Sequence, residues 1–240
     1  MPHDWQTWPS MAPFIQGGTL TGDDGSVEVP HSTSTPNNLT VLAHWHEIIR
    51  PRRTLETGLA YGASATLFCE LHQRAGISGS EHHAVDPFQQ KLWKNCALRH
   101  LEAHGLSSCL THHDGLSAQV LPQLWRQGIS FGMIYLDGSH LFEDVFLDFF
   151  FAHHMLEVGG LIAFDDSSHP HVRKVLRFIR RNFHTAYQEH SPYQVTRPRH
   201  ARLAHLAARL LGRQQLTLFR KTAHIERTWG TPLQDRKSVV

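Results

Sequence analysis

The stretch TLETGLAYGAS, residues 54–64, carries the signals that decide the fold. Residues 54–56 are expected to form a short strand, and Gly58 and Gly62 permit a tight turn directly after it. A helix should follow, because Leu67, Phe68 and Leu71 recur on one helical face. This strand–turn–helix order predicts the first β-α unit of an α/β domain.

The same unit recurs along the chain. Strands are expected at residues 54–56, 82–86, 110–114, 131–137 and 161–166, and helices between them should end near Gly105, Gly128 and Gly159–Gly160. Two more strands are expected at 193–196 and 216–220. With right-handed crossovers, these units predict a Rossmann-like, doubly wound, mostly parallel seven-stranded sheet with helices on both faces.

Three regions are expected. Residues 1–38 are rich in Pro, Gly, Ser and Thr and read as an irregular N-terminal arm. The main domain should span residues 39–222, with a helical insertion at about 199–213, and residues 223–240 should form a C-terminal tail. At the domain's start, Asn37 or Asn38 is predicted to cap a helix that runs to about Arg50, before Pro51.

Composition excludes several classes of protein. The chain has 240 residues, of which 40% are hydrophobic, and a formal net charge of +2 with its 21 histidines neutral. This balance gives no reason to expect a nucleic-acid partner. Three cysteines without a CxxC pair favour a reduced, cytoplasmic protein. No signal peptide is apparent, and the most apolar stretch, residues 145–156, is too short to span a membrane.

Acidic residues end the five predicted β-α strands. Glu56, Asp86, Asp114 and Asp137 close the first four, and Asp165 and Asp166 close the fifth. In an open α/β sheet, ligands bind beyond the carboxyl ends of the strands. The repetition therefore points to a ligand site at that edge of the sheet.

The glycine turn departs from the dinucleotide-binding pattern. A pyrophosphate site requires GxGxxG at this point, and the spacing of Gly58 and Gly62 does not provide it. An acid such as Glu56 beside the loop opposes a pyrophosphate and suits a cationic ligand, such as a sulfonium or an amino group. Asp86 lies 24 residues beyond Gly62, near where an acid binds ribose hydroxyls.

Four motifs together resemble those of class I S-adenosylmethionine (SAM)-dependent methyltransferases. They are Glu56-x-Gly58-x-x-x-Gly62-x-Ser64, Asp86-Pro87, Asp137-Gly138-Ser139-His140 and Gly159-Gly160-x-x-x-x-Asp165-Asp166. More narrowly, they are similar to the macrocin- and mycinamicin-type sugar O-methyltransferases and to the proteins labelled cephalosporin hydroxylases. The resemblance covers about residues 38–184. One departure is Ala60, where many methyltransferases have glycine.

The resemblance implies a role in SAM binding for several positions. Glu56 would lie near the methionine amino group, Asp86 would accept hydrogen bonds from the ribose hydroxyls, and Asp114 would lie near the adenine. The loop that approaches the cofactor would comprise Gly58, Ala60, Tyr61, Gly62 and Ser64. Asp114 has an alternative role, since an acid before Gly115 could cap the next helix.

Asp137, Asp165 and Asp166 form the predicted metal site. The fourth and fifth strands are neighbours in this fold, so their ends can bring three carboxylates together, and their repulsion calls for a cation. Oxygen ligands of this kind suit Mg²⁺. Adjacent residues of a strand face opposite ways, so Asp165 and Asp166 can both bind only where the chain turns. Alternatively, one of them caps the segment that follows.

His140 is the predicted general base. It lies three residues beyond Asp137, at the mouth of the same strand. An imidazole with an ordinary pKa near 6.5 can accept the proton of a substrate hydroxyl. In the sugar O-methyltransferases this histidine position acts as the base, so the resemblance assigns that role to His140, with Asp137 beside it in the catalytic group.

These observations predict a metal-dependent O-methyltransferase that acts on a small hydroxylated molecule, such as a sugar or a natural-product intermediate. A nicotinamide-dependent oxidoreductase is the alternative among enzymes, and a cofactor-binding module without catalysis is the alternative from another class. The absence of GxGxxG disfavours the oxidoreductase.

A basic region follows the fifth unit. Residues 173–227 contain 13 Lys or Arg and only two acids. Most of this charge is expected on a solvated helix face, but it could also attract anionic substrates such as phosphorylated or nucleotide-linked sugars. One helical face would carry Leu203, Leu206, Ala207, Leu210 and Leu211, with Arg202, Arg209 and Arg213 off it. That helix could cover the active site, pair in a homodimer or lie on a membrane.

Overall fold

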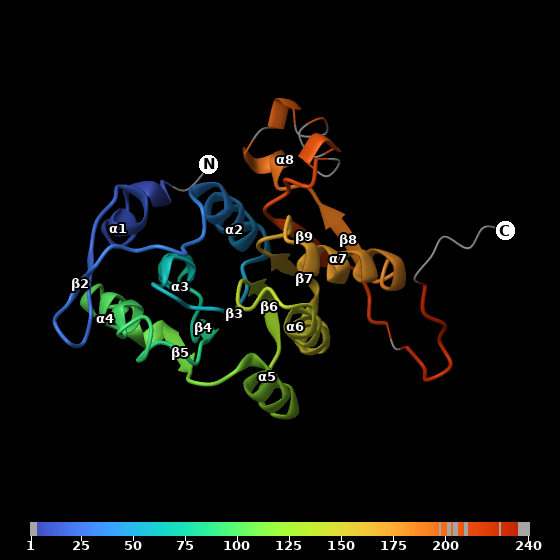
Figure 1. The fold of residues 1–240 in the computed structure, drawn as a ribbon, viewed down its shortest axis with the longest axis horizontal. Helices are drawn as coiled ribbons and strands as arrows, with labels where there is room; N and C mark the ends of the chain where they lie inside the picture. The colour runs from blue at the N-terminus through green and yellow to red at the C-terminus, as the bar shows by residue number, and fades with distance from the viewer. Residues whose placement is uncertain are drawn as a thin grey trace.

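The computed structural model describes residues 4–196, 198–200, 203, 206–208, 211–225 and 227–234 (Figure 1). A seven-stranded sheet has the strand order β5-β4-β3-β6-β7-β9-β8. The strands are β3 (Arg53–Thr57), β4 (Glu81–Val85), β5 (Leu110–His113), β6 (Phe131–Leu136), β7 (Leu156–Phe164), β8 (Tyr187–His190) and β9 (Thr217–Lys221). The first five are parallel, and β9 lies antiparallel between β7 and β8. The predicted doubly wound, mostly parallel sheet is confirmed.

Helices cover both faces of this sheet (Figure 1). One layer contains α2 (Pro36–Ile49), α3 (Ala63–Ala75) and α4 (Cys96–Ala103), and the other contains α5 (Ser117–Arg126), α6 (Phe142–Met155) and α7 (Pro170–Asn182). Alternate side chains of β6 pack into the hydrophobic cores on the two faces of the sheet. Met133 and Tyr135 pack with α2 and α3, whereas Ile134 and Leu136 pack toward α6. Because β3 to β7 are parallel, their carboxyl ends lie at the same edge of the sheet.

The last third of the chain differs from the sequence prediction. Residues 193–196, predicted as a strand, form the short helix α8 (Tyr193–Thr196), and the outer strand is instead β8. Pro192 accepts hydrogen bonds at its carbonyl from Val195 and Thr196, so the chain coils just beyond it. Of the two strands predicted near the C-terminus, only the second is confirmed, since β9 matches the expected 216–220 closely.

Three boundaries also differ. Gly159–Gly160, predicted to end a helix, lies inside β7, where a Cβ on Gly160 would be 2.7 Å from the Gly132 carbonyl oxygen of the adjacent strand. The helix expected from residue 89 begins only at Cys96. Thr35 caps α2 by accepting from the Asn38 amide, so neither Asn37 nor Asn38 is the cap.

The N-terminal arm packs against the domain. It contains the 3-10 turns η1 (Trp5–Thr7) and η2 (Pro9–Met11), the short helix α1 (Ala12–Ile15) and the hairpin of β1 (Leu20–Thr21) and β2 (Val27–Glu28). Trp5, Trp8 and Met11 are buried in the same core as α2 and α3. The arm is therefore part of the hydrophobic core.

Replacing Trp5 with alanine should lower the free energy of unfolding by about 3–5 kcal/mol, the usual cost of removing a large buried aromatic side chain. The side chain is 2% exposed and packs within the core shared with α2 and α3. Denaturant unfolding measures the change. A loss below about 0.5 kcal/mol, as at an exposed site, would contradict the packing described here.

Parts of the predicted insertion and tail lie outside the described residues. Among the positions of the predicted amphipathic helix, Arg202, Arg209 and Leu210 are not described, and neither are residues 226 and 235–240 of the tail. Leu203, Leu206 and Leu211 are described and exposed. Among the described residues, no helix combines the length and apolar character needed to cross a bilayer.

Candidate functional site

A cavity of about 570 Å³ opens at the carboxyl ends of β3, β4, β6 and β7. Its walls come from the arm at Ser32–Thr35, the turn at 57–64, the end of β4 at 85–88, the start of α5 at 116–118, the loop at 137–140, Asp165–Asp166 and Gln215. This is the edge at which the strand-end acids were expected, and it agrees with the general position of ligand sites in open α/β sheets.

The glycine turn shapes one side of the cavity. Gly58 has φ +86°, and a Cβ there would lie 2.3 Å from the carbonyl oxygen of Asp137, so no larger residue fits. Gly62 also has φ +86° and immediately precedes α3. Ala60 takes the left-handed conformation at φ +45°, a region that favours glycine. All five predicted loop residues line the cavity: Gly58, Ala60, Tyr61, Gly62 and Ser64.

The three acids predicted to contact the cofactor occupy different environments. Asp86 lines the cavity, and its carboxylate accepts hydrogen bonds from the backbone amides of Leu59 and Ala60 at 3.0 and 2.9 Å, which fixes the turn. Asp114 is exposed outside the cavity lining, and α5 has no side-chain cap, so the capping alternative does not apply. Glu56 is fully buried beneath the turn, also outside the lining, with a carboxylate oxygen 3.4 Å from His82 Nε2.

The fourth and fifth strand ends bring together Asp137, His140 and Asp166. One potential ligand atom from each lies within 4.8 Å of the others. His140 Nε2 is 2.8 Å from an Asp166 carboxylate oxygen. Asp166 has φ +44°, so the chain turns directly after β7 and Asp165 and Asp166 point to different sides. The cluster thus pairs two predicted metal ligands with the predicted base.

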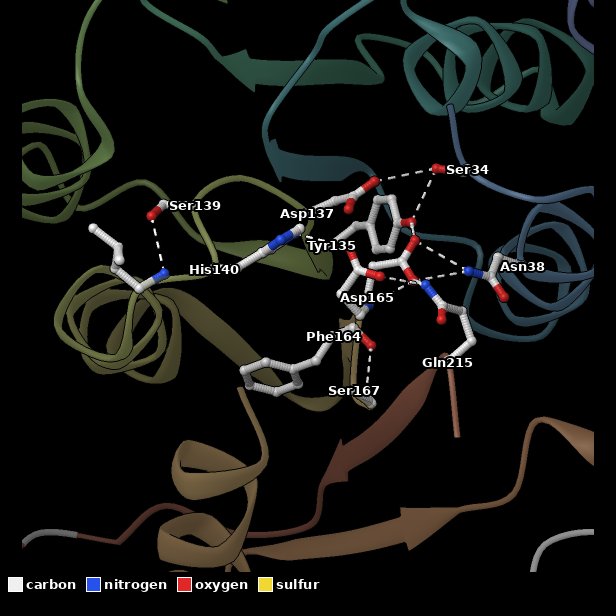
Figure 2. Close-up of polar contacts among 12 residues, drawn as sticks. Ser34, Asn38, Tyr135, Asp137, Ser139, His140, Phe164, Asp165, Ser167 and Gln215 are labelled. Carbon is white, nitrogen blue, oxygen red and sulfur yellow. Dashed lines mark hydrogen bonds and ion pairs between the residues drawn. The ribbon is translucent and has the colours of Figure 1, made fainter. Parts of the chain in front are cut away.

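Asp165, the third predicted ligand, is buried in a separate hydrogen-bond network (Figure 2). The Asn38 amide donates to both of its carboxylate oxygens at 2.9 and 3.0 Å, and the hydroxyl of the buried Tyr135 donates to one of them. The side chain of Gln215 bridges Asp165 and Asp166 with donors at 3.2 and 2.5 Å. The carboxylate oxygens of Asp165 therefore accept hydrogen bonds from protein side chains, and these bonds orient Asn38, Tyr135 and Gln215.

Ser34 connects the arm to this network (Figure 2). Its hydroxyl lies 2.9 Å from Tyr135 Oη and 3.3 Å from a carboxylate oxygen of Asp137. The arm thereby contacts the reactive end of the cavity as well as the hydrophobic core. A deletion that removes Ser34 would affect folding and the site together.

Burial and charge shift the pKa values of the cluster. Burial, and next the charge of Asp165, raise the pKa of Asp137 well above its usual value. The hydrogen bond to Asp166 raises the pKa of His140, and the same contact lowers the pKa of Asp166. The shifts of His140 and Asp166 are those of an ion pair, whereas the shift of Asp137 is that of a buried carboxylate beside another carboxylate, an environment that a bound cation would stabilise.

The described cavity lining is strongly acidic. It contains six aspartates and neither lysine nor arginine: Asp86, Asp137, Asp144, Asp148, Asp165 and Asp166. Such a cavity disfavours a pyrophosphate and favours cationic ligands. The prediction of an acidic environment is thus supported, but the charge at the lining comes from these aspartates and not from the Glu56 side chain.

Sequence reasoning missed Asp148, as well as Ser34, Asn38, Tyr135 and Gln215. Asp148 interrupts an otherwise apolar run in α6, which was an available signal, but nothing indicated that this helix position faces the cavity. Burial raises the pKa of Asp148 to about 6, and one of its carboxylate oxygens has no hydrogen-bond partner. The other four residues come from segments without a recognisable motif.

Asp148→Asn should stabilise the protein at neutral pH. The folded state raises this pKa from 3.8 to about 6, so folding binds a proton between these values and wild-type stability falls as pH rises through them. Asparagine does not titrate, so the gain should reach about 3 kcal/mol above pH 6 and vanish near pH 4. Melting temperatures at both pH values check this, with the exposed Asp114→Asn as control. Equal effects at both pH values would contradict it.

Comparisons with known proteins agree with the observed fold. Residues 55–167 match a protein family described as a methyltransferase domain. No curated protein matches the sequence. Among solved structures, the O-methyltransferase TomG from Streptomyces achromogenes, involved in tomaymycin synthesis and solved in complex with SAM, is 19% identical with a TM-score of 0.58, covering 81% of this chain and 84% of that one.

Two further structures are similar. An O-methyltransferase from Bacillus cereus in complex with S-adenosylhomocysteine (SAH) is 19% identical, with a TM-score of 0.56 and coverage of 68% of this chain and 76% of that one. A putative O-methyltransferase from Klebsiella pneumoniae is 17% identical, with a TM-score of 0.59 and coverage of 81% and 84%. The sheet order, the cavity at the strand ends and these comparisons show that the chain has the Rossmann-like methyltransferase fold.

Proposed function

We propose that the protein is a SAM-dependent methyltransferase that methylates a hydroxyl group of a small acceptor. The observation that carries this proposal is the acidic cavity at the glycine turn, with six aspartates and no described lysine or arginine. SAM carries a sulfonium and an ammonium group, so this environment attracts it, whereas it repels the pyrophosphate of a nicotinamide cofactor. The family match and the structural neighbours support the same activity.

The turn and Asp86 would bind the cofactor. Gly58 and Gly62 let the turn pack closely against the Asp137 carbonyl and Ala97, and Asp86 lines the cavity and fixes the turn through the amides of Leu59 and Ala60. Glu56 is buried behind the turn and lies outside the cavity lining, so it would support the turn without direct contact with the cofactor. Asp114 lies outside the cavity lining that the structure describes, so we propose no direct contact between Asp114 and the cofactor.

A divalent cation fits the second cluster. Asp137 and Asp166 offer carboxylate oxygens, His140 lies within the same group, and burial together with the charge of Asp165 raises the pKa of Asp137. We propose that Asp137 and Asp166 hold Mg²⁺ directly, with Asp165 linked to Asp166 through Gln215. A bound Mg²⁺ would lower the pKa of an acceptor hydroxyl and orient it.

His140 would accept the proton of that hydroxyl. It lines the cavity, is half-buried, and is oriented by Asp166 at 2.8 Å. Transfer of the methyl group by in-line displacement at the sulfonium requires the acceptor oxygen to approach opposite the sulfur, which is a matter of positioning. The resemblance to macrocin-type enzymes favours a sugar or a natural-product intermediate as the acceptor.

Conversion of SAM to SAH tests this function. The protein should release SAH when it is given Mg²⁺ and a member of a panel of sugars, glycosides and phenols, because the glycine turn and His140 line the same cavity. Chromatography with mass detection measures both SAH and the methylated product. Binding of SAM without turnover of any panel member would favour a non-catalytic cofactor-binding module, and hydride transfer with NAD would favour the oxidoreductase.

A further inference from the structure

A second cavity of about 330 Å³ lies on the far side of the wall formed by Asp166–Ser167 and Gln214–Gln215. Within each of these pairs, Asp166 and Gln215 line the acidic cavity, and Ser167 and Gln214 line the second one. The two segments are joined by a hydrogen bond of 2.9 Å from the Ser167 amide to the Gln215 carbonyl. Because consecutive Cα atoms are about 3.8 Å apart, the two cavities are close neighbours.

Four arginines of α7 line this second cavity, which we call the arginine pocket: Arg173, Arg177, Arg180 and Arg181. Arg180 makes a two-point ion pair with Glu189, at 2.7 Å for each contact. Among the described residues, no carboxylate lies within ion-pair distance of Arg173, Arg177 or Arg181. Within the part of the chain that the structure describes, these three guanidinium groups thus have no carboxylate partner.

The spacing of these arginines is unfavourable without an anion. Arg173, Arg177 and Arg181 follow one another at intervals of four residues, which places like charges next to each other on the helix. The backbone at Gly212 lies against Arg173, since a Cβ on Gly212 would be 3.1 Å from the Nη1 atom of Arg173. A bound oxyanion would relieve the repulsion, and guanidinium groups match phosphate oxygens in two-point hydrogen bonds.

We propose that the arginine pocket is a binding site for a phosphate or diphosphate group. The opposite charges of the two cavities suggest that the arginine pocket binds the phosphate of the acceptor. A phosphorylated acceptor would be repelled by the six aspartates of the acidic cavity, and the arginine pocket next to it would compensate that repulsion. The site's existence does not depend on the proposed function, although assigning its phosphate to the acceptor does.

Calorimetric titration with inorganic pyrophosphate tests the site directly. At about pH 8 and low salt, histidines with ordinary pKa values are neutral, so arginine governs anion binding. Arg177→Ala and Arg173→Ala should each weaken binding by about 10- to 100-fold, the range for a lost charge-assisted hydrogen bond. Lys174→Ala is the matched control, because this exposed residue of the same helix does not line the pocket. It should change affinity by less than about twofold.

Two results would overturn the proposal. One is no detectable binding of pyrophosphate or orthophosphate at millimolar concentration, and the other is an equal loss for Lys174→Ala and Arg177→Ala, which would indicate a general charge effect. Circular dichroism confirms that each variant is folded. These measurements involve no methyl transfer, so failure of the proposed function would leave them interpretable.

A second set of titrations identifies the source of the phosphate. UDP-glucose and glucose 6-phosphate are titrated with SAH present and compared with pyrophosphate and orthophosphate. Affinity at least tenfold higher for a phosphorylated sugar, and reduced by Arg177→Ala, would support a phosphate carried by the acceptor. Equal affinities would support the site as one for free phosphate.

Discussion

Replacing His140 with alanine should lower the methyl-transfer rate by about 10²–10⁴-fold, the usual contribution of a positioned general base. His140 lines the cavity and is oriented by Asp166 at 2.8 Å, so its removal leaves the acceptor hydroxyl without a proton acceptor. Single-turnover rates with SAM and a competent acceptor measure the effect, and SAH affinity should change by less than about threefold.

The wild-type rate should fall at acidic pH as His140 becomes protonated. The hydrogen bond to Asp166 raises the pKa of His140, so the loss should begin above the ordinary value near 6.5. His169→Ala is the matched control, because this ring lies 5.5 Å from that of His140 but outside the described cavity lining. A large loss in His169→Ala with none in His140→Ala would contradict the assignment of the base.

Asp137→Asn should abolish methyl transfer while the fold and the cofactor affinity are largely kept. An amide is a neutral and weaker ligand for a hard cation than a carboxylate, and Asp137 lies within the group of possible ligand atoms. Removing divalent cations with a chelator should have the same effect on the wild-type enzyme, and added Mg²⁺ should restore activity. SAM consumption and SAH binding are measured in parallel.

The control for this prediction is Asp165→Asn. Asp165 accepts from Asn38, Tyr135 and Gln215, so its loss should perturb the network and reduce activity less than Asp137→Asn does. Full activity of Asp137→Asn in the presence of chelator would rule out the cation. His140 and positioning would then account for the reaction.

The fold could be predicted from sequence because its signals are local. The glycine turn at 58–62 and the periodicity of the β-α units predict the first five strands and their parallel direction. Boundaries set by tertiary contacts were missed. Gly159–Gly160 was read as a helix stop, but the close approach of β6 and β7 requires small residues inside a strand.

The site was only partly predictable for a related reason. Strand ends place Asp86, Asp137 and Asp166 at one edge, which follows from topology alone. The direction of each side chain does not, so Asp165 was predicted as a ligand although Asn38 and Tyr135 occupy its oxygens. Contacts over long sequence separations, such as Ser34 with Tyr135, leave no local pattern.

The most direct test of the account is titration of the wild-type protein and Asp86→Ala with SAM, SAH and NAD, monitored by calorimetry and by melting temperature. SAM and SAH should bind and raise the melting temperature, and NAD should not, because six aspartates line the cavity. Asp86→Ala should weaken SAM binding by about 1–3 kcal/mol. Stabilisation by NAD alone, with no response to SAM or SAH, would contradict the assignment of this cavity to SAM.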